Sequence, residues 1–428
     1  MTEAASIGRL PGFRDFPPEA MAARTRIFDA WRRVARRYGF AEYDGPPLEP
    51  LELYVRKSGA EIVEQLYAFT DKGGRDVALR PEMTPSLARI LAERSRALPK
   101  PIRWFAIPQL FRYERQQRGR LREHFQWNAD VVGEAGAGAD AEVLSLAVDG
   151  LRELGLGSED FMARVSDRRL LSALFAALGI SAEQTPATMS VIDRLEREGP
   201  GRAAERLRTE ANLGDAAVRD LLGLFETPGL EAATAAFGSR DDVGERLSAL
   251  EGYRADLEAR GLGPFLSFDL RIVRGLAYYT GIVFELFDRK GELRAICGGG
   301  RYDRLLELVG GESLPAVGFG MGDVVLGELL KDRGLDASTP DGVDLFLVAT
   351  GPEQRALLLE IATAQRARGR SVSYALGADS VRRQFKAAGT AGAREVIVLG
   401  PEETARGQAR VKDMASGGER DVALSELR

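Results

Sequence analysis

The chain has 428 residues, more than one ordinary domain needs, and we expect two or three domains. Its 59 Lys and Arg against 64 Asp and Glu give a net charge of −5, so the overall field does not favour nucleic acid. The single cysteine and single histidine exclude an intrachain disulfide and a Cys/His zinc site. Neither an apolar run of about 18 residues nor a secretory signal is evident, so we expect a cytoplasmic protein without a membrane span.

The first predicted helix covers residues 19–38, where apolar side chains recur at helical spacing from Ile27 to Tyr38. Gly39 is expected to end it, since glycine readily takes the left-handed conformation that follows many helices. Three prolines within residues 46–50 then predict an extended segment with a rigid corner.

Two further segments of the N-terminal third combine strands with turns. Residues 69–75 predict a hairpin turn, after which a strand from Val77 leads into a helix that Thr84 would cap. Residues 102–130 predict a strand, an arginine-rich loop and a second strand. Apolar and polar side chains alternate through residues 111–115, so the first strand is expected to reach the loop. The alternative for these arginines is a solvated hairpin tip.

The middle of the chain predicts mostly helices. A helix over residues 139–154 and a strand over residues 161–165 precede residues 168–255, which are rich in Ala, Leu, Arg and Glu. Glycines and prolines separate the helical runs of that stretch. We expect these helices at residues 168–179, 187–198, 200–211, 214–224 and 242–260. Together they predict a small helical domain inserted between strands of a sheet.

Residues 270–285 and 297–303 carry the strongest indication of a binding site. The first range predicts two short strands joined through Gly275, followed by two adjacent tyrosines. The second places Arg301 to Asp303 after three glycines, which let a backbone approach a ligand closely. An arginine, aromatic hydroxyls and a glycine floor predict a pocket for a small polar molecule that carries an anion. The alternative is an antiparallel sheet with tyrosines in its core.

A linker over residues 331–341 precedes a C-terminal part in which strands and helices alternate. The strands are expected at residues 343–349, 371–375 and 395–399, the helices at 352–368 and 379–388, and a final hairpin at 409–423. Alternating units of this size predict a compact three-layer α/β domain.

Two strings of this sequence are long enough to carry a family resemblance. Arg274-Gly-Leu-Ala-Tyr-Tyr-Thr-Gly and Gly299-Gly-Arg-Tyr-Asp resemble the two histidine-specific signatures of the histidyl-tRNA synthetases, which are class II aminoacyl-tRNA synthetases. Phe-Arg-x-Glu at residues 111–114, with the basic loop after it, resembles motif 2 of that class. The motifs follow one another in the family's order over nearly the whole chain.

The resemblance implies an α+β fold with three parts. Residues 1–167 and 256–331 would form the class II catalytic domain, an antiparallel sheet flanked by helices. Residues 168–255 would be a helical insertion that contacts the acceptor arm of tRNA, and residues 342–428 an α/β anticodon-binding domain. The helix over residues 19–38 and the prolines after it resemble motif 1, so a homodimer is expected.

The implied activity is that of a histidine–tRNA ligase. Histidine and ATP would give histidyl-adenylate and pyrophosphate, and the histidyl group would then pass to tRNA(His) with release of AMP. Mg²⁺ would accompany ATP, and no zinc ligated by the protein is expected. Arg112 and Arg274 would be catalytic, since arginine is always charged and binds phosphate oxygens in pairs. The implied ATP site consists of Arg112, Glu114, Arg120 and Arg122.

The implied histidine site combines polar groups of several segments. The carboxylate of Glu82 and the hydroxyl of Thr84 suit the ammonium group of an amino acid. The residues that the resemblance assigns to this site are Glu82, Thr84, Gln126, Asp130, Arg274, Tyr278, Tyr279 and Tyr302. His124 lies beside them in the sequence, and a hydrogen-bonding strand residue is favoured for it over a catalytic base.

Two positions depart from the family pattern. Asp130 stands where the acid near the imidazole is usually a glutamate. Val325 stands where motif 3 usually carries an ATP-binding arginine, and Arg120 or Arg122 is expected to take over that contact. Val325 also slightly favours a second function, that of a non-catalytic paralogue that senses histidine and regulates ATP phosphoribosyltransferase. The motif 2 arginines, Arg274 and the C-terminal domain oppose this alternative.

Overall fold

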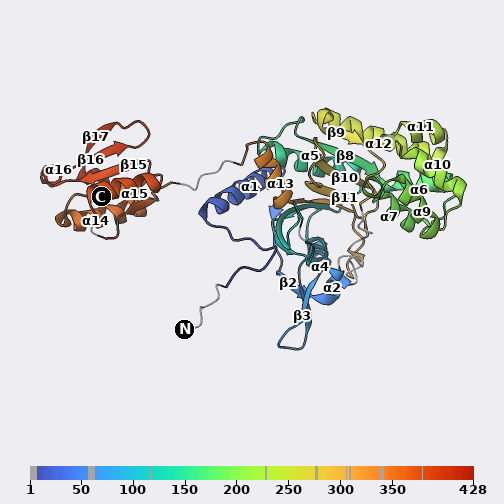
Figure 1. Cartoon of the computed structure of the whole chain (residues 1–428), viewed down its shortest axis with the longest axis horizontal. Helices are drawn as coiled ribbons and strands as arrows, with labels where there is room; N and C mark the ends of the chain where they lie inside the picture. Colours follow the sequence, from blue (N-terminus) through green and yellow to red (C-terminus); the bar gives the residue numbers. More distant parts are fainter. Residues whose placement is uncertain are drawn as a thin grey trace. The chain divides into compact units, whose positions relative to one another are not determined.

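In the computed structural model the chain forms two compact units, Met1–Asp15 with Arg24–Ala337 and Phe16–Ala23 with Ser338–Arg428 (Figure 1). The structure describes residues 7–428 except for 56–62, 116, 227–228, 275–277, 305, 308–309, 337–341 and 378. Across these described residues, no helix has both the length and the apolar character that crossing a membrane requires.

The larger unit is organised around one mixed sheet. Within the described residues it has nine strands in the order β1-β5-β7-β12-β11-β10-β8-β9, and β6 pairs with the start of β7. The strands are β1 Ala41–Glu42, β5 Ile102–Ala106, β6 Gln109–Phe111, β7 Glu123–Val132, β8 Phe161–Asp167, β9 Leu266–Phe268, β10 Ile282–Asp288, β11 Cys297–Arg301 and β12 Ala316–Gly322. The central pairs are antiparallel as predicted, whereas the edge pairs β1–β5 and β8–β9 are parallel.

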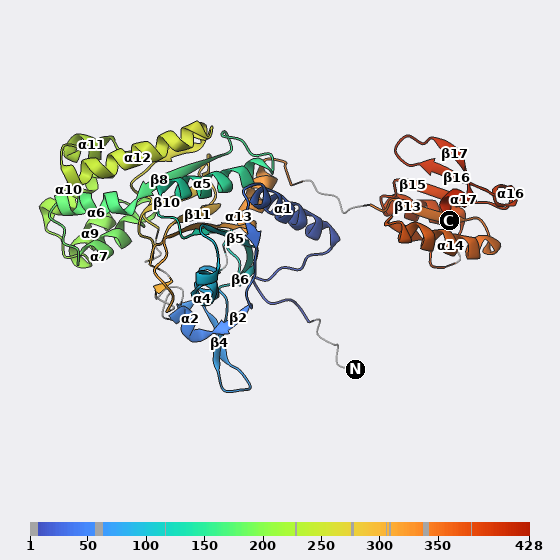
Figure 2. The same cartoon turned by 180° about the vertical axis from the view of Figure 1, so that it is seen from behind.

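Helices cover both faces of this sheet (Figures 1 and 2). One face carries α1 Pro18–Arg37, α5 Ala137–Arg152 and α13 Asp323–Asp332, and the other carries α4 Thr84–Arg94. The apolar residues that recur at helical spacing in α1 are buried against the sheet, as predicted. Trp31 of that helix stacks on Trp127 of β7 with ring centroids 5.9 Å apart, and both rings are fully buried. This stacking fixes which face of β7 belongs to the core.

A smaller sheet in the order β2-β4-β3 lies in the same unit. Its elements are β2 Leu48–Pro50, β3 Tyr67–Thr70 and β4 Asp76–Leu79, with α2 Leu51–Val55 and the 3₁₀ helix η1 Ser95–Ala97 nearby in the sequence. The predicted hairpin turn connects β3 to β4, and Asp71 accepts the N–H groups of Gly73 and Arg75 there. The prediction that Thr84 caps α4 is wrong, because Met83 occupies the cap position without a side-chain hydrogen bond.

The segment after β8 is helical, as predicted. Its helices are α6 Arg168–Ala177, α7 Thr185–Ile192, α8 Leu195–Glu198, α9 Pro200–Thr209, α10 Asp215–Leu224, α11 Glu231–Phe237 and α12 Asp241–Ala259, followed by the 3₁₀ helix η2 Gly263–Phe265. Asp167 starts this segment as an N-cap, because its carboxylate accepts the N–H groups of Arg169 and Leu170. The single helix predicted for residues 187–198 is wrong, since the chain breaks into α7 and α8, and α11 was not predicted.

The smaller unit is a five-stranded sheet in the order β14-β13-β15-β16-β17, counted over the described residues. Its elements are β13 Leu345–Ala349, β14 Val372–Tyr374, β15 Glu395–Leu399, β16 Gln408–Asp413, β17 Glu419–Ala423, η4 Pro352–Gln354, α14 Arg355–Ala367, α15 Val381–Thr390, α16 Pro401–Ala405 and α17 Leu424–Leu427. Alternate residues of β13 enter two separate clusters, Leu345 and Leu347 with α14 residues, and Phe346 and Val348 with Ala388 of α15. This is the predicted three-layer domain.

Two predicted strands of the larger unit are wrong. Residues 270–274 form a turn and irregular chain, because Asp269 accepts the N–H of Arg271 at 3.0 Å and bends the backbone. The joint predicted at Gly275 lies outside the described residues. The strand predicted from residue 102 to the loop is interrupted at Pro108, which has no N–H to donate. After β6 ends, Tyr113 instead donates its N–H to the carbonyl of Gln65 at 2.7 Å.

Arg301 of β11 anchors the start of α5 from inside the protein. Its guanidinium pairs with Asp140 at 2.5 Å and donates to the carbonyls of Glu134 and Gly136 at 3.0 and 3.1 Å. The side chains of Arg301 and Asp140 are only 3% and 2% exposed. The buried ion pair therefore joins the sheet to the first turn of α5, and the two hydrogen bonds join it to the loop that precedes this helix.

Breaking this pair should be costly for folding. In Arg301→Met the Asp140 carboxylate stays buried without its cation, and we expect the free energy of unfolding to fall by about 3–5 kcal/mol. The double variant Arg301→Met/Asp140→Leu removes both charges and should regain most of that loss. Urea denaturation measures both changes, and a loss below about 1 kcal/mol in the single variant would contradict the assigned role.

Candidate active site

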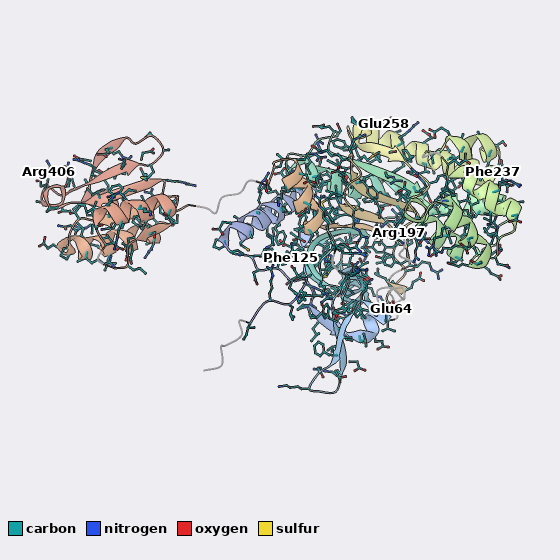
Figure 3. All side chains as sticks on the ribbon, in the orientation of Figure 1. Glu64, Phe125, Arg197, Phe237, Glu258 and Arg406 are labelled. Atoms are coloured by element: carbon teal, nitrogen blue, oxygen red, sulfur yellow. The ribbon has the colours of Figure 1, made fainter. Side chains whose placement is uncertain are left out.

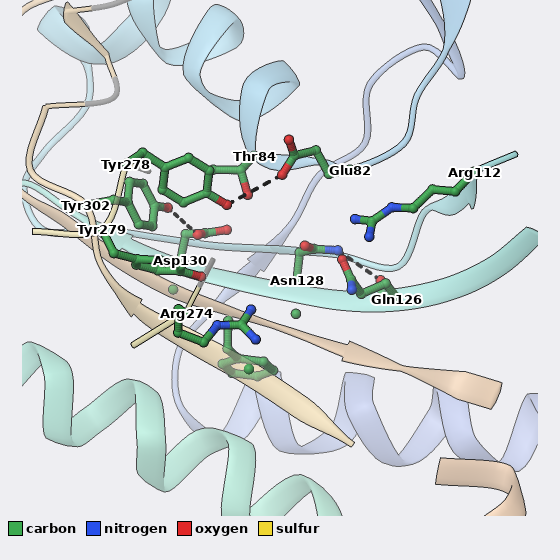
Figure 4. A pocket seen from close by; sticks show the side chains of 14 residues that line it. Glu82, Thr84, Arg112, Gln126, Asn128, Asp130, Arg274, Tyr278, Tyr279 and Tyr302 are labelled. Atoms are coloured by element: carbon green, nitrogen blue, oxygen red, sulfur yellow. Dashed lines mark hydrogen bonds between the residues drawn. The ribbon is translucent and has the colours of Figure 1, made fainter. Parts of the chain in front are cut away.

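A small pocket of about 70 Å³ lies on the face of the sheet opposite Trp31 and opens beside a larger cavity of about 620 Å³. Arg112, Gln126 and Arg274 line both (Figure 4). The larger volume falls in the range of small-molecule sites. The two cavities together could therefore hold a small polar molecule next to a larger one.

The pleat of β7 supplies one wall of the small pocket. Gln126, Asn128 and Asp130 point into it, while Trp127 and Ala129 between them enter the core on the other face. Asn128 donates from Nδ2 to the carbonyl oxygen of Gln126 at 3.1 Å. The sequence analysis missed Asn128, although its place midway between two predicted site residues, at a period of two, would have identified it.

Three glycines of β11 and β12 leave room for the polar side chains of the pocket. A Cβ atom at Gly318 would overlap the Asp130 carboxylate, and one at Gly298 would overlap the Arg274 guanidinium. A Cβ atom at Gly320 would lie 2.6 Å from Cδ of Gln126. Of the glycines predicted as a floor at residues 298–300, only Gly298 lines the pocket, and Gly318 and Gly320 complete it. The protein's own side chains occupy the space that these glycines leave.

Asp130 and Tyr302 form a buried pair at one end of the pocket. The hydroxyl of Tyr302 donates to Oδ1 of Asp130 (Figure 4). Burial raises the pKa of Asp130 from 3.8 to about 7, and the hydrogen bond from Tyr302 only partly opposes this rise. A carboxylate so placed can accept a hydrogen bond from a second N–H or O–H group of a bound molecule.

Three tyrosines, together with Glu82 just before α4, form another part of the wall of the small pocket. Tyr278 donates its hydroxyl to Oε2 of Glu82 at 3.5 Å, and Glu82 is 5% exposed. The rings of Tyr278 and Tyr279 lie 4.9 Å apart, and those of Tyr278 and Tyr302 lie 5.9 Å apart. Burial raises the pKa of Tyr278 well above 10, so its hydroxyl keeps its proton. Thr84 lines the pocket beside them.

Arg274 reaches the pocket from a strained backbone position. Its φ of 61° is unusual for a residue other than glycine, and such strain costs about 1–3 kcal/mol. Its guanidinium pairs with Glu285 of β10 and lies 5.8 Å from the centre of the Tyr279 ring. Glu285 stands opposite Gly298 in the β10–β11 register, so the glycine and the carboxylate together define the place of the arginine.

The arginine-rich loop places only some of its predicted residues at the cavities. Arg112 donates from Nε to the carbonyl of Pro81 at 2.9 Å and lines both cavities. Glu114 and Arg120 pair with each other and line the larger one. Arg122, in contrast, is not among the described residues that line either cavity, and it lies over the Tyr113 ring at 4.1 Å.

Three other residues that the sequence analysis singled out do not line the small pocket. Arg301 faces α5 rather than the pocket, and Asp303 pairs with Arg169 at 3.0 Å, so the sequence interpretation that both supply polar groups to the pocket is wrong. His124 lines the larger cavity, and burial lowers its pKa to about 3, which keeps it neutral. This agrees with the view that it is not a catalytic base.

Neither Asp323 nor Val325 of α13 supplies a positive charge to the larger cavity. Asp323 pairs with Arg14 at 2.9 Å and accepts the N–H of Phe125 at 2.8 Å, so it is turned into the protein. Val325 lines the larger cavity and is 8% exposed. Within the described ranges, no cluster of three or more His, Cys, Asp or Glu side chains is arranged to hold a metal ion.

Comparisons with known proteins agree with the geometry. Residues 12–322 match the family model described as histidyl-tRNA synthetase, and residues 344–428 match an anticodon binding domain. The chain is 44% identical to the histidine–tRNA ligase of Opitutus terrae over 99% of this chain and 97% of that protein. It is 40% identical to the chloroplastic/mitochondrial histidine–tRNA ligase of Arabidopsis thaliana, over 97% of this chain and 85% of that protein. The crystal structure of histidyl-tRNA synthetase from Nostoc sp. PCC 7120 superposes with a TM-score of 0.81 at 25% identity, covering 99% of both chains.

The mixed sheet, its flanking helices and the separate C-terminal domain define a class II aminoacyl-tRNA synthetase fold. The chain belongs to the histidyl-tRNA synthetase family. The predicted family, fold class and type of enzyme, a ligase that forms aminoacyl-tRNA, are confirmed.

A substitution at Gly298 tests whether the position of the Arg274 guanidinium matters for catalysis. The alanine methyl group in Gly298→Ala would displace the guanidinium, and we expect histidine-dependent exchange of pyrophosphate into ATP to fall about 10²-fold or more. Gly327→Ala in α13 is the control, because nothing lies within 4 Å of the added atom. It should leave exchange unchanged and stabilise the helix slightly. Equal activities of the two variants would show that the position of the Arg274 guanidinium over Gly298 is not required.

Asp130 predicts a specific dependence of stability on pH. Between about pH 4 and pH 7 the unfolded chain loses the Asp130 proton while the folded protein keeps it, so rising pH destabilises the wild type. Asp130→Asn has no such proton to lose. Its free energy of unfolding relative to wild type should therefore increase by up to about 4 kcal/mol from pH 4 to pH 8, as measured by urea denaturation. A difference that does not change with pH would mean that Asp130 ionises normally.

Proposed function

We propose that this chain ligates histidine to tRNA(His) in two steps, through a histidyl-adenylate. The observation that carries the proposal is the meeting of three chemical groups in one small pocket. An amine-binding pair, Glu82 and Thr84, an imidazole-binding pair, Asp130 and Tyr302, and the cation of Arg274 all line it. A cavity large enough for a nucleotide adjoins it.

Histidine would fill the small pocket with its ammonium group toward Glu82 and Thr84. Its imidazole would donate an N–H to Asp130, while Gln126 and the tyrosines at 278, 279 and 302 complete the walls. A site built to pair buried polar groups rejects molecules that cannot pair them. The internal partners of Asp130 and Glu82 support this view, since these carboxylates are held in place before histidine arrives.

ATP would occupy the larger cavity, with Arg112 at the α-phosphate and Glu114 accepting from the adenine amino group. Arg120 lines the same cavity and would meet the phosphates. Arg122 lies on Tyr113, so a role in binding ATP would require it to leave that ring. Mg²⁺ would bridge the phosphates of ATP, as magnesium commonly keeps water and phosphate ligands rather than a dedicated protein cage.

The first step is an in-line attack of a histidine carboxylate oxygen on the α-phosphorus, with pyrophosphate leaving. Arg112 and Arg274 would flank that phosphorus and bind the charge that grows on its oxygens. In the second step the terminal hydroxyl of tRNA attacks the carbonyl carbon, and AMP leaves. Arg274 pairs with Glu285 in the free protein, so substrate binding would exchange one partner of this arginine for another.

The partners follow from the domains. The C-terminal unit would read the anticodon of tRNA(His), and the helical insertion would meet the acceptor arm. Arg206 of that insertion pairs with Glu198 and Glu210 at 2.9 and 2.6 Å, so RNA would have to compete with these ion pairs to bind it. The domain borders at residues 168, 256 and 342, the homodimer and the cytoplasmic location stay predictions.

A second candidate function is that of a histidine-sensing regulatory paralogue, and Val325 is the observation that favours it. In that case the small pocket would bind histidine while the larger cavity would not support catalysis. Arg112, Arg274 and the matched anticodon-binding domain favour the ligase.

Histidine-dependent exchange of labelled pyrophosphate into ATP separates the two functions. We expect exchange by the wild type in the presence of Mg²⁺, and a loss of about 10²–10³-fold in Arg274→Ala with little change in stability. Arg304→Ala is the matched control, since that arginine is 77% exposed and pairs with Glu307. Absence of exchange, with histidine still binding in calorimetry, would favour the regulatory paralogue.

A further inference from the structure

The larger cavity contains both paired and unpaired charges. Arg120 is paired with Glu114, and Arg274 with Glu285. A nucleoside triphosphate brings several negative charges into such a space. A phosphate group can bind Arg120 or Arg274 only if the existing ion pair of that arginine breaks. An arginine without an internal partner can bind phosphate without that cost. Among the described residues that line this cavity, one arginine with this property lies outside the arginine-rich loop.

Arg294 lies in the loop between β10 and β11 and lines the larger cavity. The loop is held firmly on both sides of it. Asp288, which is 4% exposed, accepts the N–H groups of Glu292 and Leu293 at 3.2 and 3.0 Å. On the other side, Ile296 donates its N–H to the carbonyl of Leu286 at 2.8 Å. The backbone therefore presents Arg294 from a fixed position.

The pairing of β11 with β12 brings the end of the loop that carries Arg294 to the beginning of α13. β11 pairs with β12 so that Cys297 stands opposite Met321, and Gly322 donates its N–H to the carbonyl of Ile296 at 3.2 Å. β12 ends at Gly322, and α13 begins with the next residue, two positions before Val325. Arg294 and Val325 line the same cavity. A long side chain from residue 294 thus enters the same cavity as the position where α13 lacks an arginine.

Within the part of the chain that the structure describes, Arg294 is exposed and has neither a side-chain hydrogen bond nor an ion pair. The other arginines near the cavity are less available. Arg122 lies over Tyr113, and Arg118 pairs with Asp332 at 3.1 Å. Arg197, where the helical insertion meets the sheet in Figure 3, is 3.8 Å from Glu198 on its own helix.

We propose that Arg294 binds the terminal phosphate of ATP. It would take over the role of the motif 3 arginine, whose position Val325 occupies in this chain. This inference rests on the proposed function and specifies its nucleotide site. The planar guanidinium can bind two phosphate oxygens at once. With Arg112 at the α-phosphate, the triphosphate would be held at both ends, and pyrophosphate would be positioned to leave in line.

The test uses the full-length protein and three variants. In Arg294→Ala, the KM values for ATP and for pyrophosphate in the exchange reaction should rise about 10–100-fold, while histidine affinity in calorimetry stays unchanged. Arg294→Lys should recover part of the loss. Lys290→Ala, an exposed residue of the same loop that does not line the cavity, is the matched control and should behave like wild type.

Transfer of histidine from preformed histidyl-adenylate to tRNA provides the second measurement. Histidyl-adenylate carries no β- or γ-phosphate, so Arg294→Ala should transfer at the wild-type rate. Adding Val325→Arg to Arg294→Ala should lower the KM for ATP again. Circular dichroism establishes that each variant is folded, and Arg294→Gln replaces the alanine variant if the latter is not.

Two outcomes would overturn the inference while leaving the proposed function intact. The first is a KM for ATP in Arg294→Ala within about twofold of wild type, since loss of a phosphate-binding cation should exceed this. The second is an equal loss in exchange and in transfer from the adenylate, which would indicate a structural role. Wild-type protein without histidine-dependent exchange would instead overturn the proposed function, and this inference with it.

Discussion

The polar side chains that β7 brings to the pocket depend on the pleat of that strand, because neighbouring residues must point to opposite faces. Trp127 and Ala129 are held in the core by α1 and by β12, and this leaves Gln126, Asn128 and Asp130 on the other face. A shift of one residue in register would exchange the two sets. The core and the site are thus two sides of one strand, and packing against Trp31 also orients the acid that would recognise imidazole.

Most charged groups of the site already have partners in the free protein. Tyr302 donates to Asp130, Tyr278 donates to Glu82, and Glu285 pairs with Arg274. Each partner restricts a side chain to one place, so less conformational freedom remains to be lost when substrates bind. The glycines at 298, 318 and 320 leave the space that these polar side chains need, because any side chain there would displace a polar group.

The sequence predicted those parts that local pattern or a long specific string determines. Helical spacing gave α1, alternation gave the C-terminal domain, and the two signature strings indicated the family. It did not predict features that depend on distant segments. Glu285 is recognised as the partner of Arg274 only when β10 and β11 are paired, and the direction of Arg301 toward α5 depends on Asp140, 161 positions away. Residues 111–115 alternate like a strand, yet β6 ends at Phe111, and Tyr113 donates its N–H to Gln65 instead of continuing the strand.

The ion pair between Arg14 and Asp323 spans 309 positions of the chain, and the hydrogen bond between Asp130 and Tyr302 spans 172. A ribosome makes the chain from its N-terminus, so β7 leaves the exit tunnel long before β12, the strand that must lie beside it. During this interval one edge of β7 and its aromatic face lack their final neighbours, which is a situation that invites wrong pairing or chaperone binding. Among the helices from α6 to α12, α9 contacts α10 and α11 contacts α12 over short distances in sequence, so these pairs can form meanwhile. Synthesis of the chain therefore completes the helices α6 to α12 before the strands β9 to β12 of the large sheet.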